Sequence, residues 1–246
     1  MLLAHISDLH LDGSEHAASR ARRVFAFLAA MRTPVDALLV TGDLTDHGTE
    51  AEYEEVRALV DGFTRPLLLC PGNHDVRGSY RKVLLNEPAS DEPINRLHDL
   101  PGARVVMCDS VVPGRDAGRL ADDTLDWLAG ALTATPAMTP VLVAMHHPPL
   151  RLHSHFIDEI RQFDGERLAE LLDKHPQVVA VLCGHAHTPA ATTFAGRPLV
   201  VAPAVATTLR LAEETVIDLD RQMPPALAFH FLDDAGRLTT HYRLVA

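Results

Sequence analysis

The chain has 246 residues, 47% of them hydrophobic and 22% charged, a composition typical of a globular protein large enough for a substantial core. Its 22 basic and 33 acidic side chains give a net charge of −11, which excludes a general attraction to nucleic acid polymers or to an anionic membrane. Three scattered cysteines exclude a disulfide framework. With neither a signal-peptide pattern nor a long apolar run, we expect a cytoplasmic protein without a membrane segment.

Strand and helix patterns alternate through most of the chain. Short apolar runs predict strands at residues 2–6, 37–41, 66–70, 103–108, 140–145 and 178–183. Periodic segments between them predict helices at residues 15–32, 49–60, 79–85, 122–132 and 166–174. Thr49 and Glu52 fit a capping box at the start of the second helix. Such alternation favours a largely parallel sheet covered on both faces by helices.

The pattern changes after residue 190, where the helical segments stop. An Ala-Gly turn separates two strand-like runs in TTFAGRPLVVA (192–202), and Asp234-Ala235-Gly236 predicts a hairpin turn. We expect the antiparallel strands of about 191–246 to complete the sheets of a single domain spanning 1–246.

Five of the apolar strands are followed at once by carboxylate, amide or imidazole side chains. The stretches are LLAHISDLH, ALLVTGDLTDHG, LLLCPGNHD, VLVAMHHPP and AVLCGHAH. Ligands bind where the carboxyl ends of parallel strands share an edge, so we expect these polar side chains to converge. The converging residues are Asp8, His10, Asp43, Asn73, His74, His146, His185 and His187.

The spacing of the last histidines leaves two interpretations open. In an extended chain, residues two apart point to the same side, which would pair Asp8 with His10. The same rule puts His185 and His187 in one row with Cys183, a partial zinc ligand set. That zinc site would leave the polar residues at the other four strand ends unexplained. We therefore favour the interpretation that Cys183 is a core residue.

Each motif taken alone also has a structural explanation. Gly42-Asp43 and Gly72-Asn73 are common turn dipeptides, and an isolated Asp-x-His or His-x-His pair can cap a helix or lie satisfied in a core. Turn chemistry gives no reason for histidine at four of the five strand ends, however. The complete set therefore favours one shared site.

In this order, Asp-x-His, Gly-Asp, Gly-Asn-His-Asp, His-His-Pro-Pro and Gly-His-x-His resemble the signature of the calcineurin-like metallophosphoesterases. The likeness is greatest to the compact bacterial cyclic-nucleotide and glycerophosphodiester phosphodiesterases, and it spans residues 8–187. It implies an α/β fold of four layers, two mixed β-sheets packed face to face with helices outside. It also implies a centre of two metal ions.

The resemblance further implies a ligand set for each ion, with Asp43 shared between them. The first ion would be held by Asp8, His10, Asp43 and His187. The second ion would be held by Asp43, Asn73, His146 and His185. Two such ions can activate water and clamp an in-line displacement at phosphorus. Imidazole, carboxylate and amide ligands without a thiolate suit Fe, Mn, Zn or Co.

His74 lies outside these ligand sets. The resemblance implies that it protonates the leaving oxygen, a task suited to a side chain that titrates near neutrality. Asp46 stands where relatives place the residue that orients this histidine. Asp75 is a second candidate for that partner, or a helix cap.

One departure from the family concerns substrate charge. Protein Ser/Thr phosphatases of this superfamily carry an arginine where this chain has His47. Losing a bidentate, permanently charged donor disfavours monoester dianions and fits a diester monoanion. His47 itself could touch the substrate or lie in solvent.

Two loops have open roles. His147, His153 and His155 in the segment 147–163 could line the substrate mouth, or this segment could be a surface loop that enters a helix. Arg115 and Arg119 in the segment 109–120 could meet a phosphate or face water.

The sequence thus predicts a metal-dependent phosphodiesterase for a small diester, with cyclic nucleotides and glycerophosphodiesters both open. Alternatives are a phosphomonoesterase or nucleotide pyrophosphatase of the same fold, or a non-catalytic interaction module, which the complete ligand set disfavours. The lack of a basic stripe and an aromatic content of 5% disfavour a nuclease. The apolar run 227–231 could serve a homodimer as a sheet edge, or could be buried in the core.

Overall fold

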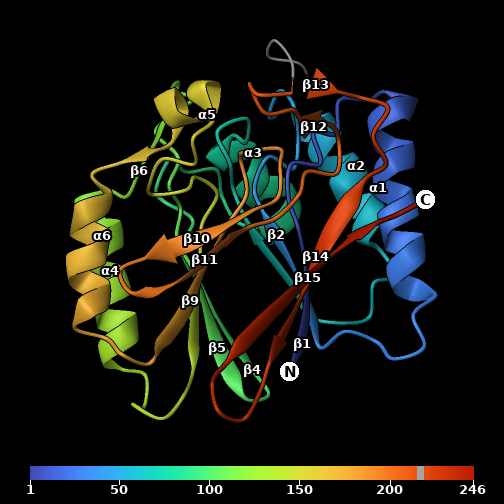
Figure 1. The fold of residues 1–246 in the computed structure, drawn as a ribbon. Helices are drawn as coiled ribbons and strands as arrows, with labels where there is room; N and C mark the ends of the chain where they lie inside the picture. The colour runs from blue at the N-terminus through green and yellow to red at the C-terminus, as the bar shows by residue number, and fades with distance from the viewer. Residues whose placement is uncertain (215–218) are drawn as a thin grey trace.

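Two mixed β-sheets form the centre of the molecule, and helices cover the outer face of each (Figure 1). The computed structural model describes residues 1–214 and 219–246. Seen edge-on, the layers follow the order helix, sheet, sheet, helix. This arrangement confirms the predicted four-layer α/β fold.

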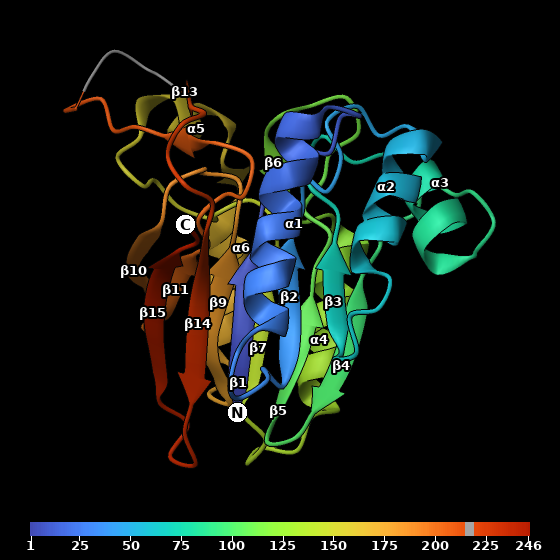
Figure 2. The same ribbon diagram turned by 90° about the vertical axis from the view of Figure 1, so that its right-hand side faces the viewer.

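The first sheet has the strand order β15-β14-β1-β2-β3 and lies behind α1 in Figure 2. Its strands are β1 Leu2–Ile6, β2 Ala37–Thr41, β3 Leu67–Cys70, β14 Ala226–Leu232 and β15 Leu238–Leu244. β1, β2 and β3 run parallel, whereas β14 is antiparallel to β1 and to β15. The carboxyl ends of the three parallel strands therefore lie at one edge.

The second sheet has the order β10-β11-β9-β7-β5-β4. Its strands are β4 Arg96–Leu100, β5 Ala103–Met107, β7 Val141–Ala144, β9 Val178–Cys183, β10 Ala190–Phe194 and β11 Arg197–Val201. The four inner strands run parallel, and both edge strands are antiparallel to their neighbours. The C-terminal strands are thus divided between the two sheets.

Helices and two small strand pairs complete the structure. The helices are α1 Glu15–Ala29, α2 Glu50–Val60, α3 Arg77–Tyr80, the π-helix η1 Arg81–Leu85, α4 Asp122–Thr133, α5 His155–Ile160 and α6 Gly165–Asp173. The strand pairs are β6 Gly118–Arg119 with β8 Gln162–Phe163, and β12 Thr208–Leu209 with β13 Leu219–Asp220. The predicted capping box at the start of α2 is present. Within the described residues, no helix is both long and apolar enough to cross a bilayer.

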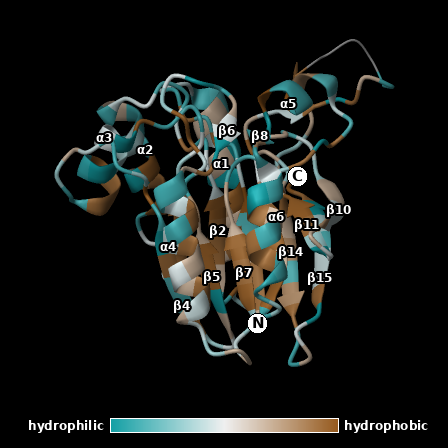
Figure 3. Ribbon diagram, turned by 90° about the vertical axis from the view of Figure 1, so that its left-hand side faces the viewer, coloured by the Kyte–Doolittle hydropathy of each residue, from teal (hydrophilic) through white to brown (hydrophobic). Residues whose placement is uncertain are grey.

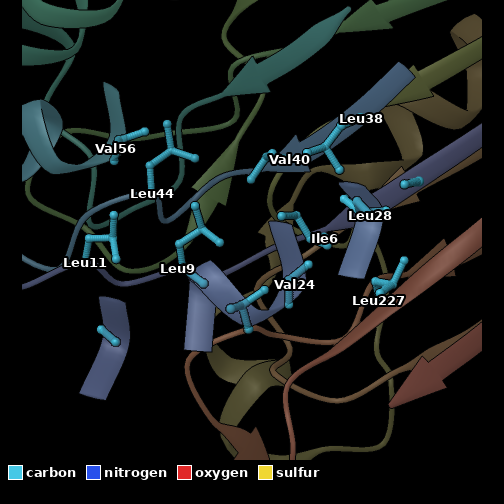
Figure 4. Packing of buried hydrophobic residues seen from close by; sticks show 14 of the residues in the cluster. Ile6, Leu9, Leu11, Val24, Leu28, Leu38, Val40, Leu44, Val56 and Leu227 are labelled. Carbon is cyan, nitrogen blue, oxygen red and sulfur yellow. The ribbon is translucent and has the colours of Figure 1, made fainter. Parts of the chain in front are cut away.

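Three hydrophobic clusters fill the three spaces between the layers. Strand alternation divides β2 between two of them: Leu38 and Val40 pack with α1, while Leu39 packs between the sheets. Figure 4 shows Leu38 and Val40 beside Val24 and Leu28 of α1. A third cluster lies between the second sheet and helices α4 and α6. Figure 3 shows the same division as apolar strands behind helices with polar outer faces.

Several details differ from the predictions. Residues 79–85 form the end of α3 and a π-helix instead of one α-helix, and β4, α5 and the two small strand pairs were not predicted. The run 227–231 is not a sheet edge, because β14 lies between β15 and β1. Core burial explains it, with Leu227 and His230 fully buried. Cys183 is also fully buried, as expected of a core cysteine.

Candidate metal centre

The polar residues that follow five strands meet at one end of the two sheets. Hydrogen bonds between the loops hold them there: the Asp8 N–H donates to Gly42 O and the His10 N–H to Asp43 O, both at 3.0 Å. The chain does not stay extended as expected. Positive φ angles occur at Asp8, His10, Asp43, His185 and His187. The expected extended backbone is therefore wrong. Asp8 and His10 nevertheless lie in one group, whereas His185 and His187 do not.

The first group contains the ligands assigned to the first ion. His10 Nε2 lies 3.1 Å from His187 Nε2 and 3.5 Å from Asp43 Oδ2. Asp8 Oδ1 lies 3.5 Å from His187 Nε2 and is buried with no hydrogen-bond partner among the described residues. A buried carboxylate oxygen that lacks a hydrogen-bond partner and faces an imidazole nitrogen is a suitable cation ligand.

The second group contains the ligands assigned to the second ion. His146 Nε2 lies 3.1 Å from His185 Nδ1, 3.1 Å from Asn73 Oδ1 and 3.3 Å from Asp43 Oδ2. Asp43 Oδ2 thus faces both groups, while its Oδ1 accepts a hydrogen bond from the His74 N–H at 3.0 Å. His185 and His187, two residues apart in the chain, belong to different groups.

The hydrogen bonds of the rings show that lone pairs converge in the second group. His146 Nδ1 lies 2.6 Å from Thr41 O, and His185 Nε2 lies 3.1 Å from Ile160 O. Because a carbonyl oxygen only accepts, both of these nitrogens carry protons, which leaves His146 Nε2 and His185 Nδ1 as lone pairs when the rings are neutral. With Asn73 Oδ1, three acceptors surround one point. A proton can bridge only two of them, whereas a metal ion accommodates all three.

The electrostatics of the centre favour positive charge between the two groups. Burial alone lowers the pKa of His146, but the Asp43 and Asp8 carboxylates outweigh it and raise this pKa to about 9. His10 behaves alike: burial lowers its pKa, while Asp46 and Asp43 raise it to about 9. The carboxylates that would hold these protons can hold metal cations instead.

The two remaining histidine ligands favour the neutral, metal-binding form. Burial lowers the pKa of His185 well below the ordinary value, and His147 and His146 lower it further. Burial also lowers the pKa of His187, a shift that nearby Asp8 only partly opposes. Neutral imidazoles are the form that binds metal ions.

His74 lies beside the first group, where its ring centroid is 4.6 Å from that of His10. Its Nδ1 donates to the main-chain oxygen of Asp46 at 2.8 Å, and the Asp46 carboxylate lies 3.6 Å away. That carboxylate accepts a hydrogen bond from His10 Nδ1 at 2.8 Å. Asp46 therefore orients His74 through its carbonyl and His10 through its side chain.

Asp75 is neither the hydrogen-bond partner of His74 nor a helix cap. Its buried carboxylate accepts hydrogen bonds from the N–H groups of Gly72 and Leu44 at 2.8 and 3.1 Å, and from the Tyr53 hydroxyl at 2.9 Å. It thereby ties the loop after β2 to the loop after β3. Both loops carry predicted ligands.

A cavity of about 540 Å³ opens above the candidate metal centre and lies within the range of small-molecule sites, about 300–1,000 Å³. Its polar wall includes His74, Asp12, Asp46, Asp116 and Arg221. Its apolar wall comes from α5 and the strand pair β12–β13, through Phe156, Ile157, Ile160, Leu209 and Leu219. Figure 1 shows α5 and β12–β13 at the same end of the molecule.

The other candidate substrate residues lie away from this wall. The described lining of the cavity does not include His47, His147 or His155. His47 Nδ1 lies 2.6 Å from Glu52 Oε1 at the start of α2, and His155 is exposed on α5. His147 is fully buried, with Nδ1 2.8 Å from the Ser110 hydroxyl and Nε2 3.1 Å from Asp116 O.

The loop 109–120 contributes a carboxylate to the cavity and not an arginine. Asp116 is its lining residue, while Arg119 pairs with Asp164 at 2.7 Å outside the described lining. Sequence reasoning also missed Thr207, whose hydroxyl lies 2.8 Å from His187 Nδ1. Thr207 directly precedes the two-residue strand β12 and has no motif around it, so no local signal could have identified it.

Comparisons with known proteins show the family of this chain. The model of the family described as calcineurin-like phosphoesterase matches residues 1–189. A probable cyclic nucleotide phosphodiesterase of Rhodococcus erythropolis is 38% identical over 210 residues, which cover 81% of this chain and 69% of that protein. A glycerophosphodiester phosphodiesterase of Enterobacter lignolyticus is 31% identical over 242 residues, which cover 94% of this chain and 86% of that protein.

A solved structure shares the fold. It is a dimetal phosphatase of Danio rerio, which matches with a TM-score of 0.73 at 16% identity and covers 100% of this chain and 99% of its own. The family model covers most of the chain, and relatives exceed 30% identity across most of their length. The chain therefore belongs to the calcineurin-like phosphoesterase family.

Proposed function

We propose that this protein is a binuclear-metal phosphodiesterase that hydrolyses a small phosphodiester. One observation carries the proposal: Asp43 Oδ2 lies 3.5 Å from His10 Nε2 and 3.3 Å from His146 Nε2, within reach of both histidine groups. A carboxylate oxygen shared by two clusters of imidazole, carboxylate and amide ligands suits a pair of ions of the Fe, Mn, Zn or Co class.

The residues would divide the work as follows. Bound ions would supply an activated water and neutralise charge on the phosphate. Asp46 holds the ring of His10 and fixes the main-chain acceptor of His74. With Nδ1–H so bound, the cationic form of His74 would donate its Nε2 proton to the leaving oxygen, which then departs as a neutral alcohol and leaves His74 neutral.

The charges of the cavity favour a diester over a monoester. Asp12, Asp46 and Asp116 line it, and among the described lining residues Arg221 is the one arginine. His47, which stands where monoesterases have an arginine, is bound to Glu52. A diester carries one negative charge at neutral pH, so it meets less repulsion here than a monoester dianion does.

The apolar wall favours a substrate with a ring. Phe156 and Leu219 are both half exposed at the cavity, at 50% each, although water solvates such side chains poorly. A nucleobase would cover them, whereas glycerol would not. Of the two substrate classes that the relatives' names print, cyclic nucleotides fit this wall better.

The test is hydrolysis of bis(p-nitrophenyl) phosphate and p-nitrophenyl phosphate by metal-stripped protein titrated separately with Mn, Fe, Zn and Co. We expect metal-dependent cleavage that favours the diester. A panel of cyclic nucleotides and glycerophosphodiesters would then rank natural substrate classes. Metal binding without turnover of either ester would overturn the proposal, and faster monoester cleavage would assign a phosphomonoesterase instead.

A further inference from the structure

Arg20 is a buried cation that the proposed reaction does not use. It lies in α1 with 4% of its surface exposed. Within residues 1–214 and 219–246 it forms no salt bridge, and the nearby Asp220 carboxylate pairs with Arg210 instead. Buried arginines are normally paired with a carboxylate, so this one requires another explanation.

The guanidinium donates hydrogen bonds to main-chain carbonyls that lie far from α1 in the sequence. Nε donates to Val205 O at 2.7 Å and Nη1 to Arg221 O at 3.2 Å. Nη2 is buried without a hydrogen-bond partner among the described residues. Burying a charge in this way costs free energy that an apolar side chain of similar volume would not, so stability alone does not account for Arg20.

Val205 belongs to the segment 204–209, which is bound to loops of the first ion. The Val205 N–H donates to Ser7 O at 2.9 Å and the Ala206 N–H to Asp8 O at 3.0 Å. The Thr207 hydroxyl lies 2.8 Å from His187 Nδ1, and the Leu209 N–H donates to His187 O at 3.0 Å. The segment thus borders two ligands assigned to the first ion, Asp8 and His187.

The ligand side chains of the second ion have other main-chain acceptors. His146 is held by Thr41 O, and His185 is held by Ile160 O. Arg20 forms no hydrogen bond to either acceptor among the described residues. Two hydrogen bonds link the two regions, from Ser7 Oγ to Thr41 O at 2.9 Å and from the His185 N–H to Asp8 Oδ2 at 3.1 Å. Because Thr207 contacts the His187 ring directly, the larger effect of Arg20 should fall on the first ion.

We propose that Arg20 is a positioning residue for the first ion. It fixes the segment 204–209, and through Thr207 that segment sets the ring of His187. The inference rests on the proposed two-ion centre. Outer hydrogen-bond partners of metal ligands typically change metal affinity by about 10- to 100-fold, and Arg20 acts one residue further out.

The experiment is titration of the metal-free protein with Co²⁺, followed by visible absorption and by calorimetry. The wild type should bind two ions. Arg20→Met and Arg20→Lys should weaken one binding step by about 10-fold and change the other step much less. Arg20→Lys keeps the charge but not the planar set of donors, and it carries the test if Arg20→Met fails to fold.

A matched control and a second variant make the test specific. Arg23→Met removes a guanidinium of the same helix that donates to Val245 O at 2.8 Å, and both binding steps should stay unchanged. Thr207→Val should weaken the same step as the Arg20 variants. Combined with Arg20→Lys, it should cost less than the sum of the two single changes, because both act on His187.

Three outcomes would contradict the inference. Equal weakening of both steps would make Arg20 a structural residue only, and unchanged affinities would remove its role altogether. Additive effects of Arg20→Lys and Thr207→Val would break the link through His187. A wild type that binds no metal would instead overturn the proposed function itself.

Discussion

The predicted ligands have a strained backbone that the surrounding loops hold in place. Left-handed conformations cost a non-glycine residue about 1–3 kcal/mol each where they are strained. Five ligand positions have φ between 43° and 67°: Asp8, His10, Asp43, His185 and His187. Because main-chain hydrogen bonds between the loops hold this conformation, the ligands should bind metal with little rearrangement.

The approach of two loops around Asp43 requires glycine at position 72. A Cβ there would lie 2.2 Å from Asp43 Oδ1 and 2.4 Å from its backbone nitrogen. We therefore expect Gly72→Ala to displace Asp43 and weaken the binding of both ions at least tenfold, as measured by Co²⁺ titration. Gly130→Ala in α4, where a Cβ meets nothing within 4 Å, is the control. Unchanged metal affinity in Gly72→Ala would contradict the shared role of Asp43.

Removal of the His74 ring should separate metal binding from turnover. We expect His74→Ala to retain both ions and to lose about 10²- to 10⁴-fold in kcat with a poor leaving group, as is typical of a lost general acid. The loss should be smaller with p-nitrophenolate, which leaves without protonation. His175→Ala, close to the end of α6, is the control. Equal losses with both leaving groups would exclude the role of proton donor.

Residue identities could be predicted better than residue conformations. His146 and Asn73 were recognisable because each follows an apolar strand whose carboxyl end reaches a shared edge. The left-handed turns at His185 and His187 could not be predicted. Non-glycine residues adopt this conformation when tertiary hydrogen bonds compensate for its energetic cost. Asp46 was expected to orient His74, and nothing in the sequence indicated that its carboxylate would lie closer to His10 than to His74.

At the scale of elements, the wall of the cavity comes from the shortest pieces of the structure. α5 has six residues, and β12 and β13 have two residues each. Such elements have no periodicity to detect, and isolated helices or strand pairs this short are unstable in water. Tertiary contacts therefore decide their existence, which explains why the sequence predicted the large layers and not this wall.

Substitutions in the apolar wall of the cavity should change substrate preference without affecting the hydrolytic step. Phe156→Ala and Leu219→Ala each reduce the apolar surface of the cavity wall, and so reduce the contact available to a nucleobase ring. We expect KM for a cyclic nucleotide to rise about 3- to 10-fold, the effect of roughly 1 kcal/mol of lost contact, with KM for a glycerophosphodiester unchanged. Leu211→Ala, an exposed leucine outside the described lining, is the control. Parallel changes for both substrates would argue against ring recognition.

At the scale of the whole molecule, a chain of buried polar groups crosses the first sheet. His230 Nδ1 lies 2.8 Å from the Thr240 hydroxyl, His230 Nε2 lies 3.0 Å from His5 Nδ1, and His5 Nε2 lies 2.9 Å from the Thr41 hydroxyl. Burial lowers the pKa of His230 to about 3. Burial and the neighbouring His230 lower the pKa of His5 well below its ordinary value.

The pH dependence of stability should reflect this pair. Both rings stay neutral in the folded protein, whereas in the unfolded chain they take up protons below about pH 6.5. The contribution of the two neutral rings to the free energy of unfolding is therefore complete above that pH. It is lost as the pH falls toward about 3, by about 1.4 kcal/mol per pH unit for each ring. For His230→Leu, the slope of the free energy of unfolding against pH, measured with urea, should be smaller by that amount. His241→Leu on exposed β15 should leave the slope unchanged.

The pairing of β1 with β14 joins residues near the two ends of the chain, such as Leu2 with Phe231. During synthesis β1 can pair with β2 early, but its other edge stays open until residues 226–232 have emerged. At about 5–20 residues per second, the 185 residues between Thr41 and Ala226 take roughly 10–40 s. For that time an apolar strand edge is available to other nascent chains. The ribosome-bound protein should thus depend on chaperones, or on dilution, until its last hairpin is made.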